Sequence, residues 1–477
     1  MLKKFLYTCL VLPFCIVIPS LPISSSELEK INNESLINQN RNTIFITFNE
    51  IPNLIIENNL QLKSLRELKN SASLNLSSKI SKRYPSLDLN ANGLPQYLYG
   101  RNFNSNSANT KSSQFSINPS LIIKWDLIDP QRGLEIKSAK ENYEIAQNNY
   151  EIKKRDLIKE ARLRFHELQK SFEEIKNSEI SLNLSLQSLK DAESKFEAGI
   201  GTKFDVLEAT AQLARDQQNL EERKIAHQIN KISLREILNI NKDIEIEQSQ
   251  TLLGYWNHSL DKNILSGIEN SLSLKNITLQ RLIKENQANT FKKNNQPKIY
   301  ISNTLSSSFT RGDSLSQNID PNESGSSYSN TISLNFSWRI FNGGQNNKSY
   351  KSKQAESNAE LYEYKNLKNI LEKNIFEAYL NLQKHQKQLL STREEIASTS
   401  ESLRLARLRY EVGISTLKDV LLIQKELSNA RTKNIVAIYN YNLSLDRLER
   451  LTFLNASNEC IRRDSDKKDQ INSICDY

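Results

Sequence analysis

The sequence predicts a mainly helical protein with a membrane β-barrel portion, built from a duplicated unit. Each unit is a β-hairpin followed by a long coiled-coil helical hairpin. Three observations predict this fold class. The chain repeats itself in order, each copy contains a very long stretch without Gly or Pro, and alternating apolar and polar residues precede that stretch. Such period-two segments are typical of membrane strands, and long uninterrupted periodic segments are typical of coiled coils.

Composition supports extended helices over a large spherical core. The chain has 477 residues, of which 38% are hydrophobic and 25% are charged, with only 12 Gly and 10 Pro. The formal charge of +9 is spread among interspersed acids and bases. That pattern is typical of solvated helix faces, so no nucleic-acid partner is expected.

The N-terminus predicts a secretory signal over residues 1–25. Lys3 and Lys4 precede an uncharged apolar stretch from Phe5 to Pro22, and Ser24 to Ser26 offer small residues for cleavage. Prolines interrupt the stretch, which suits a signal better than a membrane helix.

The duplication is read from matched segments in the same order. Ile56 to Lys63 recurs as Ile268 to Lys275 with little change. The later matches are Pro85 with Pro297, Trp125 with Trp338, Gly199 with Gly413, and Asp205 with Asp419. The sequence therefore predicts a first repeat over 26–254, a second over 255–454, and a tail over 455–477.

Each repeat reads in one order: an approach helix, a β-region, a long helix and a returning helix. The first repeat places them at 47–82, 85–127, 134–198 and 203–240. The second places them at 260–293, 297–341, 345–412 and 417–452. Without Gly or Pro between Leu134 and Ala198, or between Gln345 and Val412, each long helix can reach roughly 100 Å.

The β-regions alternate like barrel strands. Ile332, Leu334, Phe336 and Trp338 share one face of residues 331–340, and Ser333, Asn335 and Ser337 share the other. Residues 116–127 repeat the pattern except at Ile122. A half-buried strand of a soluble sandwich would alternate in the same way. The segments 93–114 and 306–328, rich in Ser, Asn and Gly, are expected to be long polar loops.

Both long helices end in one motif: an aromatic residue, Gly three residues later, then Asp-Val-Leu. The first copy has Phe196, Gly199 and Asp205, and the second has Tyr410, Gly413 and Asp419. Gly199 and Gly413 can adopt the left-handed conformation that ends a helix. A carboxylate is favoured near the start of the returning helix. Two well-made hairpin turns would explain all of these residues.

The mature chain resembles the outer-membrane efflux proteins typified by TolC. The signal, the duplication, Pro85 and Pro297 before the strands, and the two tip motifs carry the resemblance. It implies a homotrimer with a 12-stranded barrel in outer-membrane lipid and an α-helical tunnel in the periplasm. A periplasmic adaptor and an inner-membrane pump would be its partners, in a tripartite efflux or type I secretion system.

The resemblance also assigns a gate at the hairpin tips. It implies that Tyr410 links to Asp205 and that Asp419 lines the constriction. Two positions depart from the family: Leu422 stands where a second acid is expected, and Ser415 where a gate arginine is expected.

Other functions have less support. The four histidines have no metal-ligand spacing, and no phosphate loop or nucleophile motif occurs, so neither an enzyme, a cofactor nor a metal is expected. The alternative is a structural coiled-coil envelope protein, or a periplasmic adaptor, which would carry one hairpin between soluble β-domains. Cys460 and Cys475 are expected to pair in an oxidising compartment.

Overall fold

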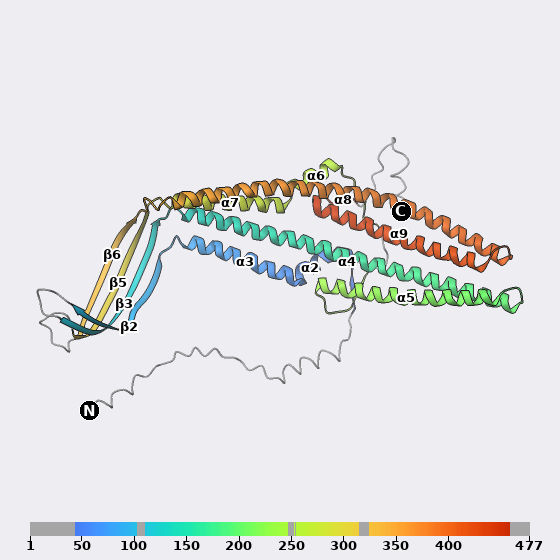
Figure 1. Ribbon diagram of the computed structural model, residues 1–477, viewed down its shortest axis with the longest axis horizontal. Helices are drawn as coiled ribbons and strands as arrows, with labels where there is room; N and C mark the ends of the chain where they lie inside the picture. Colours follow the sequence, from blue (N-terminus) through green and yellow to red (C-terminus); the bar gives the residue numbers. More distant parts are fainter. Residues whose placement is uncertain (1–42, 103–109, 247–251, 253, 314–323, 458–477) are drawn as a thin grey trace, which may run out of the picture.

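The computed structural model describes residues 43–102, 110–246, 252, 254–313 and 324–457. The protein is elongated (Figure 1). A four-stranded sheet lies at one end, and helices run from it side by side to two hairpin tips at the other end. The predicted signal peptide and both Cys460 and Cys475 lie outside the described residues.

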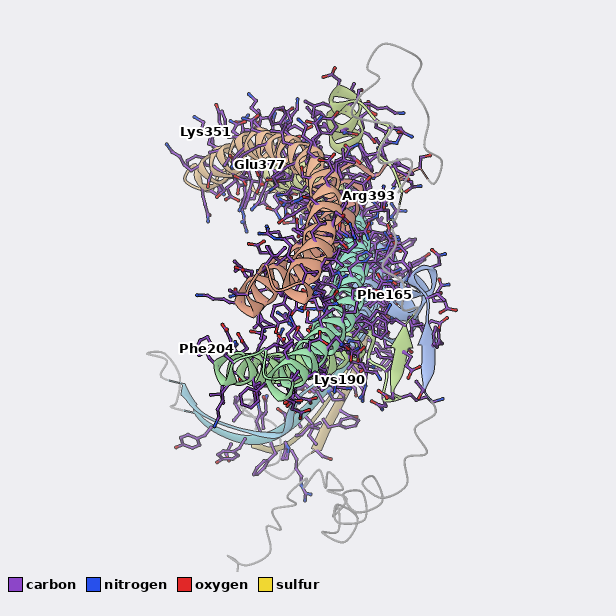
Figure 2. All side chains as sticks on the ribbon, turned by 90° about the vertical axis from the view of Figure 1, so that its right-hand side faces the viewer. Phe165, Lys190, Phe204, Lys351, Glu377 and Arg393 are labelled. Atoms are coloured by element: carbon purple, nitrogen blue, oxygen red, sulfur yellow. The ribbon has the colours of Figure 1, made fainter. Side chains whose placement is uncertain are left out.

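Four long helices form two hairpins. The first hairpin is α4 (Arg132–Glu197) and α5 (Lys203–Leu238), and the second is α8 (Gln345–Glu411) and α9 (Leu417–Thr452). Their bounds agree with the sequence prediction to within two residues. Packing between α4 and α9 joins the two hairpins. Seen along the long axis, the helices form a curved layer rather than a closed bundle (Figure 2).

Shorter helices lie between the sheet and the returning helix of each hairpin. In the first repeat η1 (Phe48–Glu50), α2 (Ile51–Asn58) and α3 (Leu60–Ser81) precede the sheet. In the second repeat α6 (Leu260–Glu269) and α7 (Leu272–Lys293) do so. Figure 1 shows α3 and α5 following one another along α4, and α7 and α9 following one another along α8. The duplicated sequence therefore forms the same arrangement twice: a long helix with a shorter helix and a returning helix placed one after the other along it.

The main sheet is antiparallel throughout. Its strands are β2 (Ser86–Asn102), β3 (Thr110–Ile128), β5 (Lys298–Asp313) and β6 (Ser324–Ser337). Their spatial order is β2-β3-β5-β6. The central pair joins the two repeats, with Leu121 opposite Leu305. Within this sheet β2 and β6 are the edge strands and have one neighbour each.

The expectation of long loops at 93–114 and 306–328 was wrong for most of those residues. The strands continue through 93–102, 110–114, 306–313 and 324–328. Here polar side chains contact one another across the strands. The Ser306 and Ser329 hydroxyl oxygens lie 2.7 Å apart, and the Ser308 hydroxyl donates to the Asn118 side-chain oxygen at 2.7 Å. A strand that uses hydroxyl and amide contacts lacks the apolar alternation by which strands are recognised.

The sheet exposes its apolar face. Ile332, Leu334 and Phe336 are 73%, 71% and 64% exposed. On the other face the Asn335 amide donates to Ser302 at 2.9 Å, and the Ser302 and Ser333 hydroxyl oxygens lie 2.8 Å apart. An apolar face turned outward and a polar face tied by hydrogen bonds are the arrangement of a strand in lipid.

Both repeats anchor the sheet by the same contact. The indole of Trp125 donates to the carbonyl oxygen of Arg83 at 2.9 Å. The equivalent Trp338 donates to the carbonyl oxygen of Asn295 at 2.8 Å. Each tryptophan therefore fixes the end of a strand to the segment that enters the sheet.

A second, small sheet lies beside the middle of α4. Strand β1 (Ile44–Ile46) runs parallel to β4 (Ile244–Ile246). Ile46, Ile55, Phe165 and Leu234 share a buried cluster beneath it. These strands were not predictable from the sequence, because three residues are too few to show a period. No helix among the described residues is both long and apolar enough to cross a membrane.

Candidate gate at the helical hairpin tips

The tip motifs form two matching turns. Gly199 and Gly413 have φ values of +73° and +78°, in the left-handed region. The amides of Ile200 and Ile414 then donate back to Lys195 and Arg409, at 3.0 and 2.8 Å, which closes each helix end. A Cβ at either glycine would meet no atom within 4 Å. Backbone conformation, not space, therefore requires glycine at these positions.

Each returning helix starts with a capping box. The Thr202 amide donates to the Asp205 carboxylate at 3.2 Å, and the Asp205 amide donates to the Thr202 hydroxyl at 3.1 Å. Thr416 and Asp419 make the same pair of bonds at 3.0 and 3.3 Å. Both aspartates are thus helix-start residues. The threonines three residues before them complete the capping boxes and were not predicted from the sequence.

Asp419 stays ionised because of its neighbours. Its carboxylate also accepts a hydrogen bond from Ser415 at 3.1 Å. The Thr416 backbone amide, then the Thr416 and Ser415 hydroxyls, hold the pKa of Asp419 below its ordinary value. Ser415, at the position of the expected gate arginine, therefore supports Asp419 within one turn. Leu422, at the position of the expected second acid, is 55% exposed.

Tyr410 joins the tips of the two hairpins, but not through Asp205. Among the described residues, no hydrogen bond links the Tyr410 hydroxyl to the Asp205 carboxylate, which is held by Thr202. Instead the Lys195 amine lies 3.7 Å from the centre of the Tyr410 ring and donates to the Tyr410 carbonyl oxygen. Burial raises the pKa of Tyr410, and the negative charges of Asp205 and Asp191 raise it further. The tyrosine is therefore neutral and near Asp205, while its partner is Lys195.

A small apolar cluster lies behind this contact. It combines residues from the ends of all four long helices. Its buried members are Ala192, Ala209, Leu417 and Leu421, with Leu189, Val206 and Tyr410 packed against them. Because each hairpin supplies part of the cluster, separating the tips would expose apolar surface from both.

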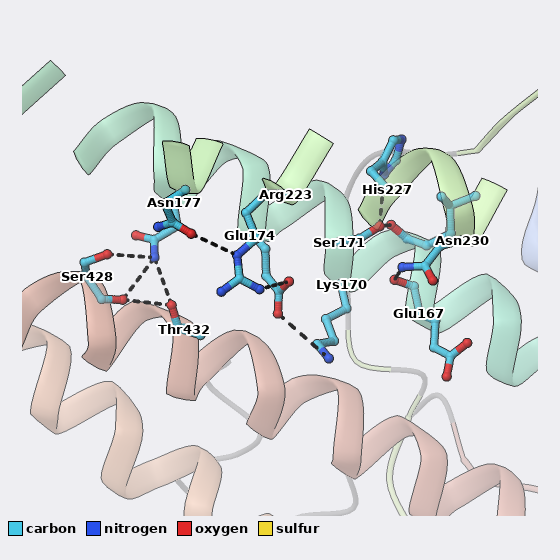
Figure 3. Close-up of polar contacts among 12 residues, drawn as sticks. Glu167, Lys170, Ser171, Glu174, Asn177, Arg223, His227, Asn230, Ser428 and Thr432 are labelled. Atoms are coloured by element: carbon cyan, nitrogen blue, oxygen red, sulfur yellow. Dashed lines mark hydrogen bonds and ion pairs between the residues drawn. The ribbon is translucent and has the colours of Figure 1, made fainter. Parts of the chain in front are cut away.

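Polar contacts continue the joint away from the tips. The Gln424 amide donates to the Ser188 hydroxyl at 2.8 Å. Further along, the Asn177 amide donates to the Ser428 carbonyl oxygen and the Thr432 hydroxyl, at 3.0 and 3.1 Å (Figure 3). Helix α4 thus contacts α9 through amides and hydroxyls here, in addition to the apolar cluster at the tips.

The histidines, which look isolated in the sequence, have partners in the fold. The His166 Nε2 atom lies 3.3 Å from an Asp446 carboxylate oxygen, and His227 Nδ1 lies 2.9 Å from the Ser171 hydroxyl oxygen. No group of three or more potential metal ligands occurs within the described ranges.

The fold joins a duplicated pair of long helical hairpins to a sheet with an exposed apolar face. A family model described as outer membrane efflux protein matches residues 51–239 and 266–452, one segment in each repeat. The chain belongs to this family. It is an outer-membrane efflux channel protein whose helical part lies in the periplasm.

Solved structures of similar proteins share the fold. The Campylobacter jejuni CmeC outer membrane channel is 15% identical, with a TM-score of 0.67, and the match covers 90% of this chain and 88% of that one. The outer membrane protein VceC from Vibrio cholerae is 14% identical, with a TM-score of 0.70, covering 85% and 96%. The Neisseria gonorrhoeae MtrE outer membrane channel, in its open state, is 14% identical, with a TM-score of 0.61, covering 85% and 88%. No curated protein sequence matches the chain significantly.

Proposed function

We propose that three copies of the chain form one passive exit duct through the outer membrane and the periplasm. Each copy contributes four strands, whose two edges, β2 and β6, each lack a second neighbour within the described sheet. Long edge strands are protected by pairing, and a closed barrel removes them altogether. Eight strands give a barrel filled by its own side chains. Twelve is the next multiple of four, and it leaves a lumen.

The same arrangement accounts for the two faces of the sheet. In a closed barrel the exposed Ile332, Leu334 and Phe336 would contact lipid. The hydrogen-bonded Asn335 and Ser333 would line the lumen. Outer-membrane lipid is therefore the first partner, and no catalytic step is needed for transport through such a duct.

The hairpin tips form the gate of this duct in the proposal. The observation that carries it is the contact of Lys195 with Tyr410, which ties the end of α4 to the end of α8. While it holds, this contact opposes separation of the second hairpin from the first. An inner-membrane pump, acting through a periplasmic adaptor, would open the duct by separating the hairpins. Asp419 would present negative charge at the entrance.

Two measurements test this function. Membrane fractionation followed by mass determination should place the protein in the outer membrane as a trimer. A photo-crosslinker at Ile414, which is 71% exposed at the tip, should capture an adaptor or pump protein in cells. The same probe at Lys351, far from the tips on α8, is the control. A monomer, inner-membrane localisation, or equal capture from both positions would contradict the proposal.

A further inference from the structure

A cavity lies where α7 begins and α9 ends. It has a volume of about 310 Å³ and is lined by residues of α4, α7, α8 and α9, so both repeats contribute. One side carries four cationic side chains, and the α8 side is apolar apart from Asn374. The cations are Arg155, Lys159, Arg447 and Arg450, and the apolar residues of α8 are Leu367, Ile370 and Leu371.

Most of the positive charge in this cavity is unpaired. The Arg450 Nε atom lies 2.8 Å from an Asp156 carboxylate oxygen. In the part of the chain that the structure describes, Arg155, Lys159 and Arg447 form no ion pair. The lining therefore offers four cations against one carboxylate, and that carboxylate is already bound.

Among these cations, Arg155 has the least favourable environment. Its Nη1 atom is fully buried and, among the described residues, has no hydrogen-bond partner. Burial lowers the pKa of Arg155, and the charge of Arg450 lowers it further, while Glu151 opposes both effects. A buried donor without a partner is unfavourable, and more so when it is charged. An anion in the cavity would relieve both effects.

The equivalent junction in the first repeat is closed. There the Asn59 amide donates to the Ile237 carbonyl oxygen at 3.0 Å, and the Asn239 amide donates to the Asn58 carbonyl oxygen at 3.2 Å. These bonds link the start of α3 to the end of α5. No separate group is needed at that junction.

In the second repeat both asparagines are replaced. Ser271 stands where Asn59 does, and its hydroxyl accepts from Leu274 of its own helix at 3.4 Å. Phe453 stands where Asn239 does, with the same left-handed conformation, at φ +61° against +51°. A phenylalanine in that conformation is unusual. Its ring lines the cavity, with the Arg155 guanidinium 4.4 Å from the ring centre.

The helix ends at this cavity do not add a net positive potential to that of the four cations. The start of α7 and the end of α9 both line the cavity, and their opposite partial charges oppose one another. Arg447 and Arg450 lie in the last turns of α9, where cations are ordinarily favoured. That position explains two of the four cations, but not Arg155 and Lys159, which are in the interior of α4.

We propose that this cavity binds an organic anion, a phosphate or carboxylate that carries an apolar group. The oxyanion would contact the cations of α4 and α9, and the apolar group would lie against α8 and Phe453. Because Arg155 belongs to the first repeat and Arg447 to the second, the bound anion would tie the repeats together midway along the helices. This site is independent of the gate at the tips.

Calorimetric titration of the full-length protein, purified in a maltoside detergent, tests the site. Phenyl phosphate should bind saturably, once per chain. Inorganic phosphate should bind about tenfold more weakly, since it lacks the apolar group, and benzyl alcohol should not bind. Displacement of phenyl phosphate by dihexanoyl phosphatidic acid would identify a lipid headgroup as the source. Binding without displacement would identify a soluble organic phosphate.

Variants distinguish a ligand-binding role of these residues from a purely structural one. Lys159→Gln and Arg447→Gln should each weaken phenyl phosphate binding about tenfold, as expected for one charged hydrogen bond. Arg155→Gln should abolish binding and also raise the Tm of the ligand-free protein, because it removes an unpaired buried charge. Lys351→Gln, an exposed cation of α8 outside the cavity, is the matched control. No saturable binding, or equal binding by wild type and Arg155→Gln, would overturn the proposal.

Discussion

Replacing Lys195 should open the proposed gate. In Lys195→Gln the chain keeps a long side chain but loses the charge that lies over the Tyr410 ring and the charged donor to the Tyr410 carbonyl oxygen. Opening, as proposed, separates the two hairpins and breaks these contacts. The substitution therefore destabilises the closed state and leaves the open state unaffected.

The magnitude follows from the two contacts. A cation over an aromatic ring contributes roughly 0.5–2 kcal/mol, and a hydrogen bond from a charged donor roughly 1.5–3 kcal/mol. Ordering the lysine side chain opposes them by up to about 2 kcal/mol. Subtracting the full ordering cost leaves about 0–3 kcal/mol per chain, and the middle of that range, about 1.5 kcal/mol, is roughly a tenfold change in the ratio of open to closed. If three copies open together, the ratio rises by about 100-fold or more.

Planar-bilayer recording of the purified trimer measures this ratio as the open fraction. Lys195→Gln should raise it strongly, and Lys195→Arg, which keeps charge and donors, should not. Tyr410→Phe keeps both the ring and the carbonyl, so it should stay closed, whereas Tyr410→Leu should open. Lys190→Gln on the same helix (Figure 2) is the control, because Lys190 is exposed. An open fraction that is the same for Lys195→Gln and wild type would show that the contact of Lys195 with Tyr410 does not hold the gate closed.

Three further predictions concern the barrel, the tail and the entrance. A charge at Leu334 should impair assembly by roughly 2–4 kcal/mol, as at a bilayer midplane, while a charge at Asn335 is tolerated; equal yields of folded trimer would refute the strand assignment. Cys460 and Cys475 should form an intrachain disulfide that contributes about 3 kcal/mol in the loop-entropy model; alkylation of both thiols without reductant would refute it. Asp419→Asn should abolish cation preference and divalent-ion block, and unchanged selectivity would leave Asp419 a helix-start residue only. Because hydrogen bonds lower the pKa of Asp419, its charge is present above that pKa, so wild-type preference should persist until the pH falls below the usual aspartate range.

The helical part of the fold was predictable because its signals are local and repeated. The long stretches without Gly or Pro predicted the lengths of α4 and α8, and Gly199 and Gly413 predicted where these helices end. The strand extents were not predictable, because Ser306, Ser308 and their partners replace apolar alternation with hydroxyl contacts. The small β1–β4 sheet depends on residues far apart in the sequence, and no local pattern marks it.

The candidate site was predictable in part. The turn glycines and the helix-start aspartates follow from spacing alone. The partner of Tyr410 does not, because Lys195 belongs to the other repeat and approaches Tyr410 only where the ends of α4 and α8 meet at the tips. The resemblance implies Asp205 as that partner. Asp205 is near enough to raise the pKa of Tyr410, but its carboxylate accepts hydrogen bonds from Thr202.

A cryo-electron microscopy structure of the purified assembly would show whether three copies close one barrel above a gated tunnel. We expect a threefold axis, with β6 of each copy hydrogen-bonded to β2 of the next copy. We also expect Lys195 and Tyr410 to be in contact at a closed entrance lined by Asp419. A sheet whose edges remain unpaired, or a closed entrance in which the tips of α4 and α8 are apart, would contradict this arrangement.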